Sequence, residues 1–138
     1  MALPIILPLT LGALVLAGCA KVASDIRKTR PLTTLAGSEW GPVETTAPGQ
    51  FVAFKSEGEI TGNGGCNQFF GQYTQKDDSL VIGALASTKK FCAYIMQSET
   101  AFMQKLQDTR RFEATHLALR LYDVNEVLLM QLRRRDWD

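Results

Sequence analysis

Three cysteines and a single histidine are the residues of this sequence whose types suit nucleophilic or metal chemistry, and two of the cysteines, Cys66 and Cys92, lie outside the N-terminal apolar stretch. Cys92 lies just before a predicted helix, and a helix N-terminus favours the thiolate, so one hypothesis is a redox or nucleophilic cysteine. Cys66 lies in a distant glycine-rich segment. Two cysteines and one remote histidine, His116, do not make a zinc ligand set, and no catalytic-triad motif is present. The sequence therefore predicts no metal, no cofactor and no catalytic residue.

One acidic residue, Glu99, lies where an apolar side chain is expected. At 100° per residue it falls inside the arc formed by Ile95, Phe102 and Leu106. Because an unpaired buried carboxylate is costly, Glu99 should have partners, either backbone amides of the glycine-rich turn or the side chain of Asn67. This pattern favours a structural clamp, since a functional acid would also need a cleft and a second polar group.

The element that must position these residues is the stretch from Gly62 to Tyr73. Its four glycines indicate positive φ angles or close approach of another segment, and Asn63-Gly64 is a strong turn signal. The aromatic residues that follow need a core or a groove to cover them.

The rest of the chain predicts short strands and one helix. Helical periodicity is convincing only from Tyr94 to about Leu106, with Met96 and Met103 on the flank of the apolar arc. Strands or extended segments are expected at 50–55, 59–61, 80–82, 85–91, 112–122 and 127–132. These elements do not alternate as strand, helix, strand. The prediction is therefore an α+β fold with a strongly curved antiparallel β-sheet, a partly open barrel, packed around one main α-helix.

The N-terminus carries a separate signal. Residues 2–18 are apolar and uncharged, and the run ends in Leu16-Ala17-Gly18-Cys19, which resembles a bacterial lipoprotein signal with its lipobox. The resemblance implies a signal peptide over residues 1–18 and acylation of Cys19, with palmitate among the expected acyl groups. It also implies a tether over 19–34 and a domain over 35–138. Ala20 after the cysteine favours the outer membrane, with the domain facing the periplasm.

Acylation of Cys19 would leave an even pair of cysteines, Cys66 and Cys92, in an oxidising compartment. On that basis we expect them to form a disulfide. The reactive thiol at Cys92 remains the alternative.

A second resemblance spans residues 35–132. Trp40 preceded by Leu35 and Gly37, the segment Gly58-x-Ile60-x-Gly62-x-x-Gly65-Cys66-Asn67-x-Phe69-x-Gly71-x-Tyr73, Thr88 before Cys92, and Glu99-x-x-Phe102 resemble the META domain of HslJ-like proteins (DUF306). The resemblance implies a small envelope domain, often a lipoprotein, with some members linked to heat shock and antibiotic tolerance and no established catalytic activity. It assigns structural roles to these motif residues: Trp40, Gly62, Gly65, Asn67, Gly71, Tyr73, Thr88, Glu99 and Phe102.

Three functional hypotheses follow. The first is a lipid-anchored, non-catalytic envelope domain that supports stress or antibiotic tolerance by binding an unknown protein or lipid ligand. The second is a carrier or pilot-type lipoprotein that binds an acyl chain or partner peptide in a cleft between sheet and helix. The third is a thiol-dependent enzyme. A net charge of +1 gives no reason to expect a nucleic-acid partner. The arginines at 110–111 and 133–135 are either solvated strand ends or a patch for lipid phosphates.

Overall fold

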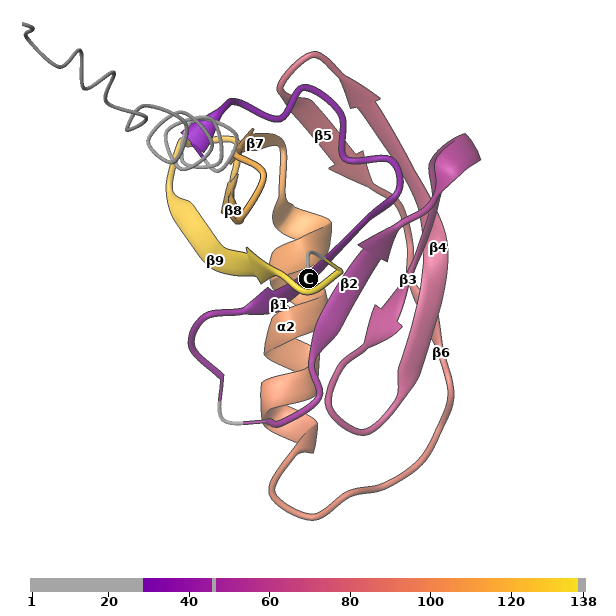
Figure 1. Cartoon of the computed structure of the whole chain (residues 1–138). Helices are drawn as coiled ribbons and strands as arrows, with labels where there is room; N and C mark the ends of the chain where they lie inside the picture. Colours follow the sequence, from indigo (N-terminus) through magenta and orange to yellow (C-terminus); the bar gives the residue numbers. More distant parts are fainter. Residues whose placement is uncertain (1–28, 46, 137–138) are drawn as a thin grey trace, which may run out of the picture.

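The computed structural model describes residues 29–45 and 47–136, which form one curved antiparallel sheet and one main α-helix. The elements are β1 Ser38–Pro42, β2 Phe51–Phe54, the 3-10 turn η1 Ser56–Gly58, β3 Glu59–Asn63, β4 Gln68–Lys76, β5 Ser79–Ile82, β6 Ala86–Ser87, α2 Met96–Asp108, β7 Arg111–Ala114, β8 Ala118–Tyr122 and β9 Leu128–Arg134. Figure 1 shows their arrangement.

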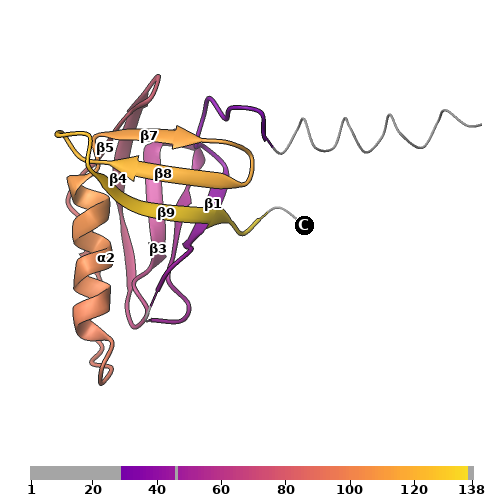
Figure 2. The ribbon, with the colours of Figure 1, turned by 90° about the vertical axis from the view of Figure 1, so that its left-hand side faces the viewer.

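The sheet curves until its strands form a ring. The strand order is β3-β2-β1-β9-β8-β7-β5-β4-β6, and an additional pairing between β3 and β4 closes the ring. The shortest strand pairing in the described part of the sheet is between β5 and β7, where one residue pair, Ser79 and Arg111, is in register. Helix α2 lies along one side of the sheet (Figure 2). The predicted fold class, α+β with a strongly curved antiparallel sheet and one main helix, is confirmed.

The core fills the space enclosed by the sheet and α2. Val52 and Phe54 of β2 point inward, as do Leu119 and Leu121 of β8, because alternate residues of a strand face opposite sides. The helix contributes Phe102 and Leu106. The complete cluster is Leu35, Trp40, Val52, Phe54, Ile60, Phe69, Tyr73, Leu80, Ile82, Phe102, Leu106, Phe112, Leu119, Leu121, Met130 and Leu132.

One predicted strand is wrong. Residues 112–122 were expected to form a single strand, but they lie in β7 and β8, which pair with each other across a turn at 115–117. The hydroxyl of Thr115 accepts hydrogen bonds from the backbone N–H groups of Leu117 (3.4 Å) and Ala118 (3.1 Å). Such local side-chain bonds favour turns, and the apolar alternation that continues through this stretch conceals the turn. His116 lies in this turn, partly buried.

Part of the segment expected as a tether contacts the domain. Pro31 forms a β-bridge with Thr115, and the backbone N–H of Leu32 donates to the carbonyl of Ala114 (2.8 Å). Leu32 also packs against the core. The predicted signal peptide and the acylation site Cys19 lie outside the described residues. Within the described residues, no helix has the length and apolar character needed to cross a membrane.

Candidate functional site

The carboxylate of Glu99 is the centre of a buried polar cluster at the start of α2. Glu99 lies in the first turn of the helix, and only 4% of its surface is exposed. Its Oε2 accepts hydrogen bonds from the backbone N–H groups of Cys66 (2.9 Å) and Asn67 (2.6 Å), and its Oε1 accepts one from Asn67 Nδ2 (2.7 Å). These are the turn amides and the side chain that the sequence suggested as partners. The helix is thereby attached to the turn between β3 and β4.

The amide side chain of Asn67 joins this carboxylate to a second segment. Asn67 Oδ1 accepts hydrogen bonds from Thr88 Oγ1 (2.8 Å) and from the backbone N–H of Lys90 (2.6 Å), and Asn67 Nδ2 also donates to the carbonyl of Lys90 (3.0 Å). Because both ends of the amide are engaged, its orientation is fixed. We call Cys66, Asn67, Thr88, Lys90 and Glu99 the Glu99 cluster.

Glycines at the turn make room for the carboxylate. A Cβ at Gly64 would overlap Cγ of Glu99, so a larger residue there would displace the acid. Gly65 has φ +114°, a conformation that favours glycine, and its N–H donates to Asn63 Oδ1 (2.7 Å). The glycine-rich segment therefore places two adjacent N–H groups on one carboxylate oxygen.

A disulfide between Cys66 and Cys92 lies beside the Glu99 cluster, with the two Cα atoms 5.9 Å apart. The predicted disulfide is therefore present. It ties the β3–β4 turn to the segment that enters α2, the same two regions that the Glu99 cluster joins. A reactive thiol at Cys92 would require this bond to be reduced first.

Hydrogen bonding sets the ionisation of Glu99. Burial alone would raise its pKa, but the backbone N–H and side-chain amide of Asn67 and the N–H of Cys66 together hold the pKa below the ordinary value of 4.5. The acid is therefore ionised near neutral pH and engaged by three donors.

This ionisation predicts a pH dependence of stability. Between the folded and the unfolded pKa of Glu99, the carboxyl group is ionised in the folded protein but protonated in the unfolded chain. The unfolded state then binds more protons, so the free energy of unfolding rises with pH. The contribution of Glu99 is complete above the unfolded value of 4.5 and is lost as the pH falls through the depressed folded pKa. The free energy of unfolding of the wild type and of Glu99→Gln can be compared by urea unfolding from pH 6 downwards. The difference between the two should become smaller as the pH falls below the unfolded pKa of Glu99. A constant difference would contradict this assignment.

The remaining motif residues lie outside this cluster and act in packing. Trp40 is fully buried, and its Nε1 donates to Ser38 Oγ (2.6 Å). Tyr73 packs edge-on against Phe54 with ring centroids 5.1 Å apart and donates to the carbonyl of Lys55 (2.8 Å). Phe102 contributes to the core.

Two further motif glycines allow close approach of neighbouring backbone. A Cβ at Gly62 would overlap the carbonyl oxygen of Phe51 and the ring of Phe69. A Cβ at Gly71 would lie 2.8 Å from the carbonyl oxygen of Ala84. Both positions therefore require a residue without a side chain.

Comparison with known proteins identifies the family. The model of the META domain matches residues 32–136. The chain belongs to the META domain family. No curated protein sequence matches it. A protein from Burkholderia xenovorans, solved by NMR, has 20% sequence identity and a TM-score of 0.63, over 74% of this chain and 84% of that one. A crystal structure of a DUF4847 family protein from Bacteroides vulgatus has 15% sequence identity and a TM-score of 0.60, over 75% of this chain and 96% of that one. These two similarities concern the fold.

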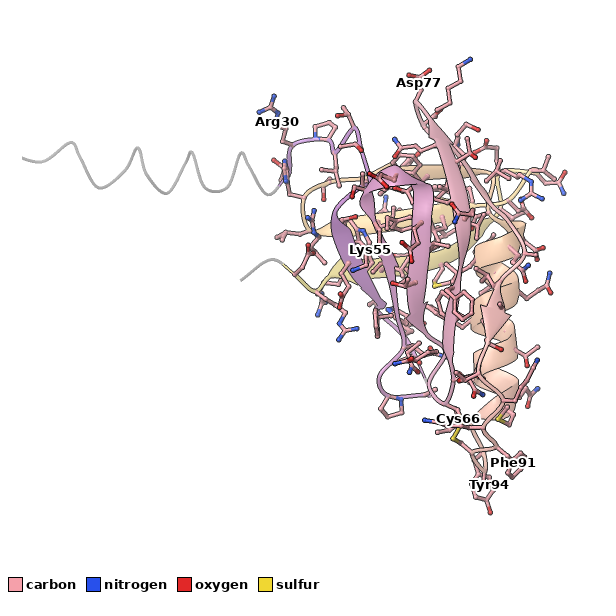
Figure 3. All side chains as sticks on the ribbon, turned by 90° about the vertical axis from the view of Figure 1, so that its right-hand side faces the viewer. Arg30, Lys55, Cys66, Asp77, Phe91 and Tyr94 are labelled. Atoms are coloured by element: carbon pink, nitrogen blue, oxygen red, sulfur yellow. A yellow bond between two sulfur atoms is a disulfide. The ribbon has the colours of Figure 1, made fainter. Side chains whose placement is uncertain are left out.

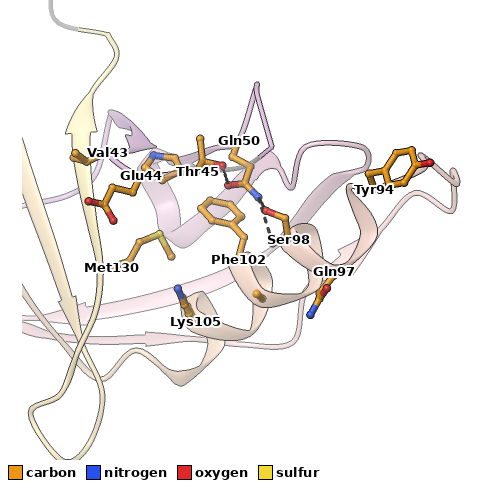
Figure 4. A pocket seen from close by; sticks show the side chains of 12 residues that line it. Val43, Glu44, Thr45, Gln50, Tyr94, Gln97, Ser98, Phe102, Lys105 and Met130 are labelled. Atoms are coloured by element: carbon orange, nitrogen blue, oxygen red, sulfur yellow. Dashed lines mark hydrogen bonds between the residues drawn. The ribbon is translucent and has the colours of Figure 1, made fainter.

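An open groove of about 690 Å³ runs along α2 of this META domain (Figure 4). We call it the helix groove; it is lined by Pro42, Val43, Glu44, Thr45, Gln50, Tyr94, Gln97, Ser98, Ala101, Phe102, Lys105 and Met130. Phe102 and Met130 provide apolar surface, and Gln97, Lys105 and Glu44 provide polar groups. A smaller groove of about 250 Å³ shares Val43, Glu44, Lys105 and Met130 and extends to Leu128.

The sequence analysis missed Gln50, which joins the helix groove to the site. Gln50 is 7% exposed, and its Nε2 donates to the carbonyl of Gly64 (2.9 Å) and to Ser98 Oγ (3.2 Å). A glutamine directly before an apolar strand was the available signal, but a polar residue at a strand end usually faces solvent.

Four of the five arginines at 110–111 and 133–135 are engaged within the fold. Arg111 pairs with Glu113 and Glu126, Arg134 with Asp136, and Arg135 with Glu39. Arg110 donates to the carbonyls of Gln107 and Thr109. Among residues 29–45 and 47–136, no group of three or more His, Cys, Asp or Glu residues is arranged to hold a metal ion.

Proposed function

We propose that this META domain is a lipid-anchored, non-catalytic binding domain of the bacterial cell envelope that supports tolerance of stress or antibiotics. The resemblance of residues 16–19 to a lipobox supports the anchor at Cys19, and Ala20 after this cysteine supports the outer-membrane location. The engagement of Glu99 supports a non-catalytic role. Its two oxygens hold three donors within the fold, so the acid best placed for chemistry serves to fix a turn.

The observation that carries the binding role is the helix groove. Its volume of about 690 Å³ lies within the range of ligand sites, and its lining combines apolar side chains such as Phe102 and Met130 with polar ones such as Gln97. The disulfide and the Glu99 cluster fix α2 at one end of this groove. A groove with a fixed wall reduces the entropy lost when a ligand binds.

The same groove favours the second candidate function, a pilot-type protein that binds a partner peptide. Strand β1 pairs with β9 only from Pro42 opposite Leu132 to Trp40 opposite Arg134. Past the end of β1, the N–H of Val43 still donates to the carbonyl of Gln131 (3.0 Å), but among the described residues no strand pairs with 128–130 of β9 on that side. An extended peptide could add to such an edge and place alternate side chains in the groove. The open, partly polar lining suits a peptide better than an acyl chain, which needs an enclosed apolar site.

The third hypothesis, a thiol-dependent enzyme, needs a free thiolate. Both cysteines within the described residues are paired with each other. The helix groove contains no cysteine among its lining residues, so a thiol at Cys92 would not act in it.

Filling the helix groove should remove the function. Ala101 is exposed on the helix and lines the groove, so Ala101→Trp should occupy it without disturbing the core. Thr100→Trp is the matched control, because Thr100 is also exposed but lines a different groove. In a strain lacking the gene, wild type and Thr100→Trp should restore survival under heat or antibiotic exposure, whereas Ala101→Trp, present at equal levels, should not. Full restoration by Ala101→Trp would show that the groove is not the binding site.

A further inference from the structure

Two exposed aromatic side chains and two lysines gather at one end of the molecule. Phe91 is 83% exposed and Tyr94 is fully exposed, and Figure 3 shows both projecting at the end of the domain beside Cys66. Lys89 and Lys90 directly precede Phe91 and are also exposed. We call Lys89, Lys90, Phe91 and Tyr94 the aromatic tip. Burial in the fold explains neither aromatic ring, although Tyr94 also lines the helix groove.

The backbone holds these side chains in a defined arrangement. Cys92, between the two aromatics, is tied to Cys66 by the disulfide, and Asn67 bonds both the N–H and the carbonyl of Lys90. Tyr94 has φ +67°, which is uncommon for a bulky side chain. Such conformations persist only where the surroundings enforce them, and they concentrate at functional sites. The backbone that carries the two aromatic rings is therefore held in place.

The charge of the aromatic tip is uniformly positive. Neither Lys89 nor Lys90 forms an ion pair with another described residue. Residues 62–68 and 86–98, the two segments that the disulfide joins here, contain no Asp or Glu. The nearest acid in the sequence, Glu99, is buried and directed at the backbone of Cys66 and Asn67. A partner that complements this tip must be anionic.

From this geometry we infer that the aromatic tip is a contact site for the interface of an anionic phospholipid bilayer. Aromatic rings beside lysines match that interface, where rings enter the headgroup region and ammonium groups meet lipid phosphates. A protein partner fits less well. Two aromatic rings bury about 150–250 Å² each, below the roughly 800 Å² per partner of a stable protein interface.

The tip lies far from the N-terminal end of the domain. In Figure 3, Arg30 lies near the opposite end from Phe91 and Tyr94. The thirteen residues from Cys19 to Pro31 would span at most about 45 Å when fully extended. An anchored domain lying along the bilayer could therefore bring both ends to one membrane. The lipid contact of the tip does not depend on acylation of Cys19.

The test is the labelling rate of individual lysines in the full-length protein. The protein is mixed with vesicles of phosphatidylcholine alone or with about 30% phosphatidylglycerol, an anionic fraction that attracts basic residues. After brief acetylation, peptide mass spectrometry gives the rate at each lysine. Two exposed lysines away from the tip, Lys55 and Lys76, are internal controls. Lys76 ends β4 directly before Asp77, which Figure 3 places at the end of the domain opposite Phe91 and Tyr94, and Lys55 lies well away from both rings. The mass of the N-terminal peptide reports separately whether Cys19 carries lipid.

With anionic vesicles, labelling of Lys89 and Lys90 should slow at least about fivefold, the factor that corresponds to one lysine contact, while Lys55 and Lys76 stay unchanged. The double variant Phe91→Ser/Tyr94→Ser should lose most of this protection. Phe70→Ser should keep it, because Phe70 is 54% exposed but lies on β4. The inference would be overturned if Lys89 and Lys90 were acetylated at the same rate with both kinds of vesicle. It would also be overturned if anionic vesicles slowed the acetylation of every lysine equally.

Discussion

Replacement of Glu99 by alanine is expected to lower the free energy of unfolding by about 3–5 kcal/mol, because buried donors without partners cost about 1–3 kcal/mol each. The change removes the acceptor of the N–H groups of Cys66 and Asn67 and of the Asn67 side chain. Water can enter from the neighbouring groove that Glu99 lines and offset part of the loss. Urea unfolding followed by circular dichroism gives the change directly.

Glu99→Gln tests whether the charge or only the shape matters. In this variant the NH₂ group of the glutamine would face Asn67 Nδ2, so two donors would meet. Asn67 cannot turn its amide to relieve this without losing the bonds from Thr88 and Lys90. We therefore expect this variant to lose stability too. Glu59→Ala, at an exposed position of β3, is the control and should change stability by less than about 0.5 kcal/mol. If Glu99→Ala behaves like Glu59→Ala, the cluster does not hold the turn to the helix.

Removal of the disulfide is the second large change. The double variant Cys66→Ala/Cys92→Ala should be less stable by about 3 kcal/mol in the chain-entropy model, given the sequence separation of 26 residues. Local opening should also increase at the β3–β4 turn and the segment before α2, since the bond joins these two regions. Urea unfolding measures the global loss, and hydrogen exchange of the amides near Lys90 and Asn67 measures the local opening.

Reductant provides the control for this prediction. It should destabilise the wild type to the level of the double variant and leave the double variant unchanged. An equal stability of oxidised wild type and double variant would mean that the Glu99 cluster alone fixes this end of the domain.

The helix and its acid were predictable from the sequence because both depend on local periodicity. Phe102 and Leu106 mark the buried face of α2, and Glu99 on the same face had to find partners. The Asn63-Gly64 signal likewise located the turn between β3 and β4.

The order of the strands in the ring could not be predicted from local periodicity. Pairing of β1 with β9 joins Trp40 to Arg134, residues distant in the chain, and no local pattern specifies it. The turn at 115–117 was missed because alternation continues through it, so periodicity alone could not separate β7 from β8.

The sequence suggested a cleft between sheet and helix, but the residues that line the helix groove could not be predicted, because they come from segments that meet only in the folded chain. Gln50 reaches Ser98 across 48 positions of sequence. Phe91 and Tyr94 resemble ordinary core residues in a sequence, and only the fold shows them exposed.

The intact mass of the protein extracted from bacterial membranes, before and after reduction with thiol alkylation, tests both the lipid anchor and the disulfide. We expect a mature chain that begins at Cys19 and carries acyl groups, with alkylation of Cys66 and Cys92 only after reduction. A chain without lipid mass, or with both thiols alkylated before reduction, would contradict a lipid-anchored, disulfide-bonded envelope domain.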